Sequence, residues 1–287
     1  SMPGIINSSL TDELMSVCST RGDALAIVDV DGIFRPTWDM ESGEQAASVS
    51  TATTQITTRN IDNSFAATYF PSVHLQGSTV NGTLIVPPSV AGIGAIARSE
   101  DLSHPWFAPA GFNRGGLSAL GGPNSALSVG GVEITLNKSQ RDDLYNVNIN
   151  PIARFPSTGD IVMFGQKTLQ TSFSSALDRI NVRRLLIYLK RQIGVIADTI
   201  LFDQNVQVTW NRFKSAAEAV LSATVADLGI TEYRIVLDET TTTPDLVDRN
   251  ILYAQIYIKP ARAIEFIAID FVIASTGASF DFGKKTA

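Results

Sequence analysis

Cysteine and histidine are nearly absent from this chain of 287 residues. Cys18 is the one cysteine, so the chain forms no internal disulfide, and no C-x-x-C pair is present to hold zinc. The two histidines, His74 and His104, are 30 residues apart in the sequence and have no ligand-type partners at a metal-binding spacing. We therefore expect a protein of a reducing compartment, with no metal ion and no cofactor.

Charge is also sparse, because charged residues make up 17% of the chain and the net charge is -6, with a pI of about 5.0. A protein that binds nucleic acid by neutralising phosphates needs a clustered basic surface. This balance therefore argues against direct contact with nucleic acid.

Long apolar runs are missing as well. No run reaches the ~18 residues of a membrane-spanning helix, and the N-terminus lacks the charged start and apolar core of a signal peptide. We expect no membrane insertion. Ser1 and Met2 resemble a cloning remnant, which suggests that the chain is a fragment of a longer protein.

What is present is the composition of a folded protein, with 44% hydrophobic residues. The length allows one large or two medium domains, and we favour two. In the first half, the patterns predict helices over 9–18, 41–58, 89–99 and 138–147, and strands over 24–30, 65–75 and 79–86. The first helix has Ser9 or Thr11 as its N-cap. Residues 101–131 read as a long contact loop with an exposed pair, His104 and Trp106.

The stretch over residues 145–193 joins a punctuated strand, ending at 161–165, to the most strongly periodic helix of the chain. At about 100° per residue, one arc of this helix is apolar and carries Val182, Leu185, Leu186, Leu189, Ile193 and Ile196. The opposite arc carries Arg183, Arg184, Lys190 and Arg191. The first arc predicts a core face and the second an exposed basic stripe.

A second amphipathic helix follows, with Asn205 as its N-cap, Trp210 on its core side and Gly229 at its end. Three strands over 232–238, 251–259 and 263–273 complete the chain. The early strands and helices predict an α/β half, and the late helix, helix and three strands predict an α+β half, with the boundary near 168–176.

One enzymatic hypothesis rests on residues 24–33, ALAIVDVDGI, where an apolar strand ends in D-x-D-G. This motif resembles the first motif of haloacid-dehalogenase-type phosphatases, which implies Asp29 as nucleophile and Asp31 as acid/base. The supporting Ser/Thr, Lys and second acidic pair are not found at strand ends. Asp and Gly are also common turn formers at strand ends.

Two further patterns, one of a catalytic triad and one of a dinucleotide-binding loop, match their families less well than the phosphatase motif does. Asp29, His74 and Ser118 follow the order of a subtilisin triad, but only the strand bearing Asp29 matches that family. The run GIGAIA at residues 92–97 has the spacing of a dinucleotide loop without the strand before it or the acid after it. Small residues that let a helix pack closely explain that run better.

The basic arc has two readings. Lys and Arg often occupy a solvated helix face, and near a C-terminus they suit the helix dipole. Against this, four cations without acids at i+4 are unusual in an acidic protein, and a negatively charged partner surface explains them.

Four collinear segments carry a more specific resemblance. They are NxNPIxxFPxxGxxxFGxKTL, INVRRLLIYLKRQI, LFDQNVxxTW and IYIKPARAIEFIAIDF, and the upstream pieces TRGDALAIVDV, TYFPSVHL and VPPSVAGIGAIARSEDLSHPWFAPAGFNRG agree. Together they resemble contractile tail sheath proteins of myophage-type bacteriophages, related to the sheaths of other contractile injection systems. The resemblance runs from about residue 21 to residue 273.

The resemblance implies a non-catalytic α/β domain of subtilisin-like topology over residues 1–169. It implies a C-terminal α+β domain over 170–287, in which two long helices pack on a small, mostly antiparallel sheet. The implied function is that of a structural, non-enzymatic subunit that polymerises as helical layers of six-subunit rings around an inner tail tube. Contraction by rigid-body movement then drives the tube through the host envelope for genome ejection.

The implied partners are other sheath subunits, the inner tail tube protein, and baseplate and tail terminator proteins. The implied location is the virion tail, assembled in the host bacterial cytoplasm. Because few residues precede residue 21, we expect the chain to lack the N-terminal arm and any insertion domains of the family, and to be monomeric alone. The haloacid-dehalogenase-type phosphatase remains the alternative.

Two sets of site residues follow from the resemblance. The basic arc, Arg183, Arg184, Lys190 and Arg191, becomes the candidate surface for attachment to the tube. The late strands become acceptors for the arms of neighbouring subunits, with Ile256, Ile258, Phe266 and Ile269 as candidates.

Overall fold

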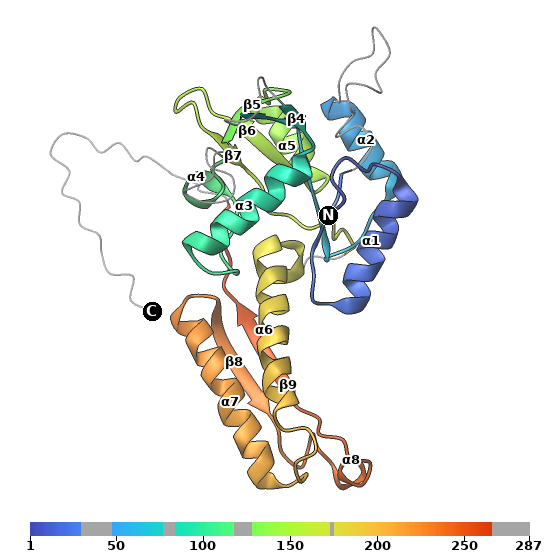
Figure 1. Ribbon diagram of the computed structural model, residues 1–287, viewed down its shortest axis with the longest axis vertical. Coiled ribbons are helices and arrows are strands. Elements are labelled where there is room, and N and C mark those ends of the chain that lie inside the picture. Colours follow the sequence, from blue (N-terminus) through green and yellow to red (C-terminus); the bar gives the residue numbers. More distant parts are fainter. Residues whose placement is uncertain (30–47, 77–83, 118–127, 173–174, 266–287) are drawn as a thin grey trace, which may run out of the picture.

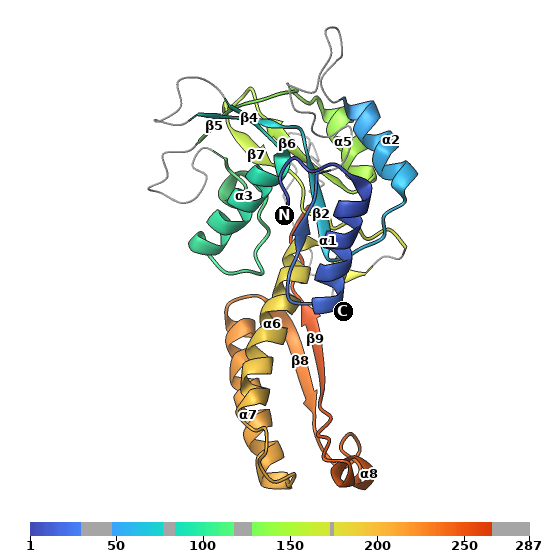
Figure 2. The same cartoon turned by 45° about the vertical axis from the view of Figure 1, so that its right-hand side comes forward.

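The computed structural model describes residues 1–29, 48–76, 84–117, 128–172 and 175–265 (Figure 1). Its helices are α1 Ser8–Arg21, α2 Val49–Arg59, α3 Pro88–Leu102, α4 Gly111–Arg114, α5 Lys138–Asn146, the 3-10 helix η2 Ala176–Asp178, α6 Ile180–Asp198, α7 Gln207–Ala226 and α8 Pro244–Asp248. Its strands are β1 Ala26–Ile27, β2 Ala66–Phe70, β3 Val73–Gln76, β4 Leu84–Val86, β5 Ser128–Val132, β6 Ile149–Arg154, β7 Ile161–Met163, β8 Ile230–Val236 and β9 Gln255–Pro260. The elements from α1 to β7 form a broad body. The second half of α6 and the elements from α7 to β9 form a narrow stalk that projects from the body (Figures 1 and 2).

The body is built on a four-stranded sheet in the order β1-β2-β6-β7. β1, β2 and β6 run parallel, and β7 is antiparallel to β6. All five residues of β2 are buried, because successive side chains point to opposite faces of the sheet and both faces are covered. Ala66 and Phe70 pack with residues of α1, α2 and α5, whereas Ala67 and Tyr69 pack with residues of α3 and of the second sheet.

The second sheet of the body is antiparallel, in the order β4-β3-β5. Helix α3 lies so close to β2 that a Cβ atom at Gly92 would be 2.6 Å from the Tyr69 ring. This contact confirms that the GIGAIA run includes a residue kept small for helix packing.

The stalk has its own apolar cluster, formed by α6, α7, β8 and β9. β8 and β9 are antiparallel and pair only with each other among the described strands. Helix α6 belongs to both parts, because Ile180 lies in the core of the body whereas Leu185 and Leu189 lie in the core of the stalk. The body and the stalk are therefore joined through a continuous helix.

Most expected helices are confirmed, with shifted ends. α1 begins after Asn7, whose side chain accepts from a backbone N–H of the first turn, so the prediction of Ser9 or Thr11 as N-cap is wrong. The helix expected over 41–58 is α2, which begins at Val49; residues 41–47 lie outside the described part.

Asn205 is not the N-cap of α7, which is Val206. The side-chain oxygen of Asn205 accepts instead from the Trp210 indole at 2.7 Å. The side-chain amide nitrogen of Asn205 donates to the carbonyl oxygen of Ile251. Trp210 is 6% exposed, which confirms it as core.

Most expected strands are present with shifted ends, and the strand expected over 65–75 is divided into β2 and β3. Within its described part, residues 24–29, the run expected as a strand over 24–30 forms a strand only at Ala26 and Ile27, where it pairs with β2. Residues 263–265 are not in a strand, and the rest of the expected last strand lies outside the described residues. The expected loop over 101–131 contains α4 and β5. Within the described ranges, none of the helices has the length and apolar composition needed to cross a bilayer.

Candidate functional site

The first six residues of α6 are all buried, including two of the four predicted cations. The Arg183 guanidinium lies 3.7 Å from the centre of the Phe65 ring. Its Nε donates to the carbonyl oxygen of Ser64 at 3.1 Å, and its Nη2 donates to the Ser64 hydroxyl. Burial lowers the pKa of Arg183. This arginine therefore anchors α6 to the body.

Arg184 is anchored on a different element. Its Nη2 lies 2.6 Å from the Glu100 carboxylate at the end of α3, and its side chain is 9% exposed. Burial lowers the pKa of Arg184, against the opposing effect of Glu100. Its Nη1 is buried without a hydrogen-bond partner among the described residues. The expectation of a four-residue exposed stripe is therefore wrong at Arg183 and Arg184, because the body covers the basic arc at this end of the helix.

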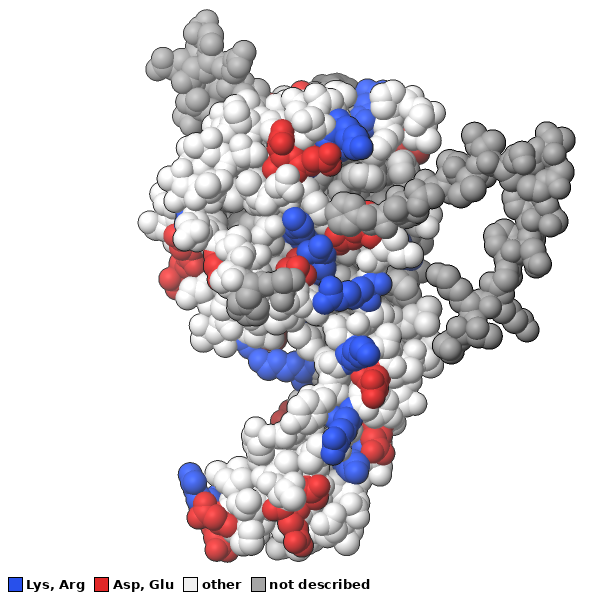
Figure 3. All heavy atoms as spheres, turned by 180° about the vertical axis from the view of Figure 1, so that it is seen from behind, with Lys and Arg blue, Asp and Glu red and all other residues white. Residues whose placement is uncertain are grey.

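The other two cations lie one turn or more farther along α6 and are exposed. Lys190 Nζ donates to the carbonyl oxygen of Arg21 at 3.1 Å, at the C-terminal end of α1. Arg191 has no ion pair with any residue that the structure describes. Seen from behind, the stalk carries basic and acidic side chains interspersed (Figure 3). The exposed basic site is thus a pair of residues and not a long patch.

Trp106 fills the joint between the body and the stalk, and its expected exposure is wrong. The residue is 6% exposed and packs in the stalk cluster with Leu185 and Leu189. Its indole Nε1 donates to the carbonyl oxygen of Asp227 at 2.9 Å, and its ring stacks on His104 at 4.6 Å between centroids. A loop of the body therefore inserts a large aromatic side chain into the stalk.

The two-stranded sheet of the stalk presents the predicted acceptor strand. Ile256 and Ile258 are partly buried against the stalk cluster, and Tyr257 between them is 56% exposed. β8 covers one edge of β9, and no described strand pairs with the other edge. Phe266 and Ile269 lie outside the described residues.

The carboxylate of Asp29 is occupied by internal contacts. Asp29 is 1% exposed and accepts from the Ser89 hydroxyl at 2.6 Å, from the Ser89 backbone N–H at 3.1 Å and from the Gly4 N–H at 2.9 Å. Desolvation raises its pKa, and these hydrogen bonds oppose the rise. Asp29 thus fixes the first turn of α3, and both oxygens of its carboxylate accept hydrogen bonds from the protein.

Of the remaining residues of the catalytic hypotheses, His74 lies in β3, which pairs with β4 and β5. Asp31 and Ser118 lie outside the described residues.

Comparison with known proteins identifies the family. A family model for the phage tail sheath C-terminal domain matches residues 172–274. The tail sheath protein of Enterobacteria phage T4 is 40% identical over 196 residues, which are 68% of this chain and 28% of that protein. The tail sheath protein of Vibrio phage KVP40 is 41% identical over 188 residues, which are 65% of this chain and 26% of that protein. The chain belongs to the tail sheath family.

Solved structures of sheaths share its fold. The helical sheath of the anti-feeding prophage in the contracted state has a TM-score of 0.68 at 21% identity, covering 94% of this chain and 68% of that one. The contracted sheath complex of the extracellular contractile injection system PVC has a TM-score of 0.66 at 23% identity, covering 81% of this chain and 62% of that one. This sheath-family chain spans 26% and 28% of the lengths of the KVP40 and T4 relatives.

Sequence reasoning missed the partners that hold α6 in place. Ser64, Glu100 and Arg21 are separated from their partners on α6 by 119, 84 and 169 residues. Periodicity reports which residues share a face of a helix but not what covers that face. One signal for burial was available, namely that positions 183 and 184 carry arginine. Arginine stacks on aromatic rings and tolerates burial better than lysine.

Proposed function

We propose that this chain is a structural part of a contractile tail sheath. In this proposal the whole protein polymerises as helical layers of six-subunit rings around an inner tail tube, and contraction drives the tube through the host envelope. The observation that carries the proposal is the match of 65–68% of the chain, at 40–41% identity, to tail sheath proteins of two phages. The likeness to contracted sheath structures over most of the chain supports it.

The family also supports a non-enzymatic role in the virion tail, because the matched relatives are named for a structural component. Assembly in the host cytoplasm, with the tube, baseplate and tail terminator proteins as partners, belongs to the same proposal.

We retain the division into residues 1–169, of subtilisin-like topology, and residues 170–287, with two long helices on an antiparallel sheet. It is supported by the apolar cluster of the stalk, whose members other than Trp106 and Phe107 all follow residue 170.

The edge of β9 with which no described strand pairs is proposed as the acceptor for an extended segment of a neighbouring subunit. An edge strand presents free N–H and C=O groups that an added strand satisfies. Ile256 and Ile258 lie on this strand, and Phe266 and Ile269 follow it in the sequence. Replacing Ile258 with proline removes an N–H donor and is expected to abolish ring formation by the full-length protein, as seen by electron microscopy. Unchanged rings contradict this acceptor role.

Lys190 and Arg191 are the pair that we propose for attachment to the tube, since the other two cations of the arc are buried. Reversing both to glutamate is expected to weaken co-assembly of the sheath with tubes at moderate salt, because exposed charges act on encounter and specificity. Lys138 and Arg154 are exposed on the body, so reversing them makes the same change in net charge and serves as the control. Equal co-assembly of the two variants contradicts the assignment.

Electron microscopy of the full-length protein tests the function most directly. Hollow helical tubes, alone or around the inner tube, are the expected result. Particles that stay monomeric in the presence of tubes contradict the proposal. For this chain of 287 residues, light scattering after size exclusion is expected to give a monomer, and spontaneous long tubes contradict that expectation.

A further inference from the structure

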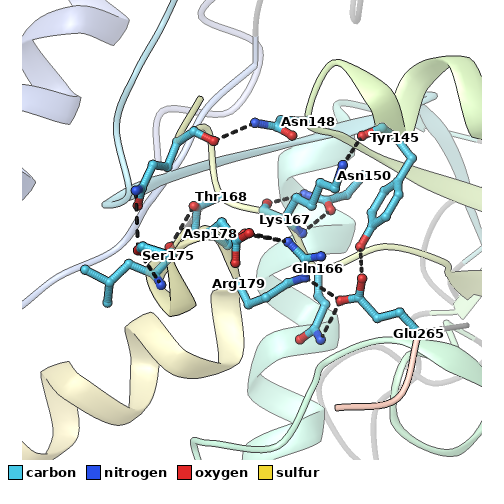
Figure 4. A network of polar contacts seen from close by, with 12 residues as sticks. Tyr145, Asn148, Asn150, Gln166, Lys167, Thr168, Ser175, Asp178, Arg179 and Glu265 are labelled. Atoms are coloured by element: carbon cyan, nitrogen blue, oxygen red, sulfur yellow. Dashed lines mark hydrogen bonds and ion pairs between the residues drawn. The ribbon is translucent and has the colours of Figure 1, made fainter. Parts of the chain in front are cut away.

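Three side chains of the body converge on one carboxylate (Figure 4). The Tyr145 hydroxyl at the end of α5 donates to Glu265 Oε2 at 2.9 Å. Gln166 Nε2, beyond β7, and Arg179 Nε, at the start of α6, donate to Glu265 Oε1 at 3.1 and 2.6 Å. The donors come from three elements that the fold holds in place, and the acceptor comes from the segment after β9. This arrangement has the form of a receptor and its ligand.

Two of the donors have further contacts within the body. Lys167 Nζ donates to the Tyr145 carbonyl at 2.6 Å and lies 4.2 Å from the centre of the Tyr145 ring. The Asn150 amide, which is fully buried on β6, bonds both the N–H and the C=O of Lys167 at 2.6 and 2.8 Å. Asp178 pairs with Arg179 at 3.0 Å. Tyr145 and Arg179 are therefore held by contacts within the body as well as by Glu265, whereas the Gln166 side chain bonds Glu265 alone among the described residues.

The segment that supplies the carboxylate has little other attachment to the residues that the structure describes. Ala263, Ile264 and Glu265 line two hollows of about 400 and 390 Å³. Ile264 is 83% exposed, so its side chain adds little apolar burial. By contrast, the side chain of Glu265 is only 16% exposed. Charged hydrogen bonds, not packing, hold this segment against the body.

The electrostatics favour an anion at this position. Burial lowers the pKa of Lys167, and the positive charge of Arg179 lowers it further. Burial and the Glu265 carboxylate both raise the pKa of Tyr145, so its hydroxyl stays protonated as a donor. Without a carboxylate, two cations would share a partly buried site with one acid, Asp178.

We propose that Tyr145, Gln166 and Arg179 form a carboxylate receptor, which Glu265 of the same chain occupies. When Glu265 is bound, the segment after β9 is attached to the body. This attachment is a second link between stalk and body, in addition to α6. The receptor follows from the contacts of the folded chain and is independent of the proposed function. In a sheath subunit it would fix the position from which residues 266–287 continue.

Tryptic cleavage after Arg262, an exposed residue of the segment, measures the fastening. Loss of charge-assisted hydrogen bonds in Glu265→Ala is expected to speed this cleavage roughly 10-fold or more, because cleavage follows local opening. Tyr145→Phe, which removes one donor and keeps the ring, is expected to give a smaller increase. Glu239→Ala removes an exposed acid of the stalk and serves as control. Cleavage of Glu265→Ala at the wild-type rate overturns the proposal.

Acetate tests whether the emptied site is a receptor. In Glu265→Ala, sodium acetate is expected to raise the thermal midpoint above its value in sodium chloride of equal ionic strength, because a ligand of the native state stabilises it. Wild type, with its site filled, and the double variant Arg179→Met/Glu265→Ala are expected to show no difference between the salts. An equal midpoint in both salts for Glu265→Ala overturns the receptor. Circular dichroism checks that each variant is folded.

Discussion

The two halves of α6 share one amphipathic pattern and have opposite surroundings. At the end nearest the body, residues from Ile180 to Leu185 are all buried, Arg183 and Arg184 included. From Lys190 onward the charged side chains are exposed, and the helix keeps only its apolar face covered. A helix that enters a second layer of structure loses its solvent face there. The same residue type is thus an anchor in the first half and a surface charge in the second.

Arginine suits the buried half for a physical reason. Its planar guanidinium stacks on an aromatic ring and donates in several directions, and it is more weakly hydrated than the ammonium of lysine. Arg183 uses both properties, on Phe65 and on Ser64. Predictions that separate the two halves therefore compare substitutions of the same type in different surroundings.

The largest effect is expected at Trp106, beside the boundary between the halves. Trp106→Ala removes a buried ring from the stalk cluster and the bond to Asp227, and is expected to cost about 3–5 kcal/mol of unfolding free energy. Phe202 is fully exposed, so Phe202→Ala is expected to stay within about 0.5 kcal/mol of wild type. Urea denaturation followed by circular dichroism measures both. Similar costs for the two variants would show that Trp106 does not join stalk and body.

The next effect is expected at Arg184. Arg184→Ala leaves a cavity and removes the ion pair with Glu100, and we expect a loss of about 2–3 kcal/mol, since Glu100 itself is half exposed. Arg184→Met keeps most of the volume and removes the unpaired Nη1, so its cost is expected to be below about 1 kcal/mol. The same denaturation experiment applies. If methionine is as damaging as alanine, the ion pair and not the packing holds this end of α6.

A buried carboxylate in the body gives a test in which pH is varied. Burial raises the pKa of Asp29, so the native state holds this proton more tightly than the unfolded state does. The contribution of Asp29 is therefore present below its unfolded pKa and is lost as pH rises through its raised native pKa. Asp29→Asn removes this pH-dependent contribution. The stability of the variant relative to wild type is therefore expected to increase as pH rises from the unfolded pKa to the native pKa of Asp29.

Thermal midpoints measured over the acid range give the comparison, and Asp23→Asn serves as the opposite case. The hydrogen bond and charge of Arg21 lower the pKa of the exposed Asp23, so its contribution is present above the unfolded pKa and is lost as pH falls through the lowered native pKa. The two variants should therefore diverge from wild type in opposite directions with pH. A parallel pH dependence of both would contradict the burial of Asp29.

These comparisons also explain what the sequence could reveal. Periodicity was sufficient for the helices and for the apolar arc of α6, because both depend on neighbours in the chain. The long collinear motifs were sufficient for the family. The burial of Trp106 was not predictable, because its Gly- and Pro-rich surroundings are those of a loop and its partners lie on α6 and α7. The Glu265 contacts join residues 86 to 120 positions apart, and no local pattern encodes such a pairing.

The smallest effects on stability are expected at Lys190 and Arg191, two adjacent exposed residues with different contacts. Lys190→Ala removes a cation from the C-terminal end of α1, where its ammonium meets the Arg21 carbonyl, and such a contact contributes about 0.3–1 kcal/mol. Arg191→Ala is expected to change stability by less than about 0.5 kcal/mol, since it lacks an ion pair with described residues. Salt should reduce the first difference, because exposed charges are screened. Denaturation of both variants at low and high salt tests this order of effects. A larger loss of stability at Arg191 that does not depend on salt would mean that the second half of α6 is also anchored by its charged residues.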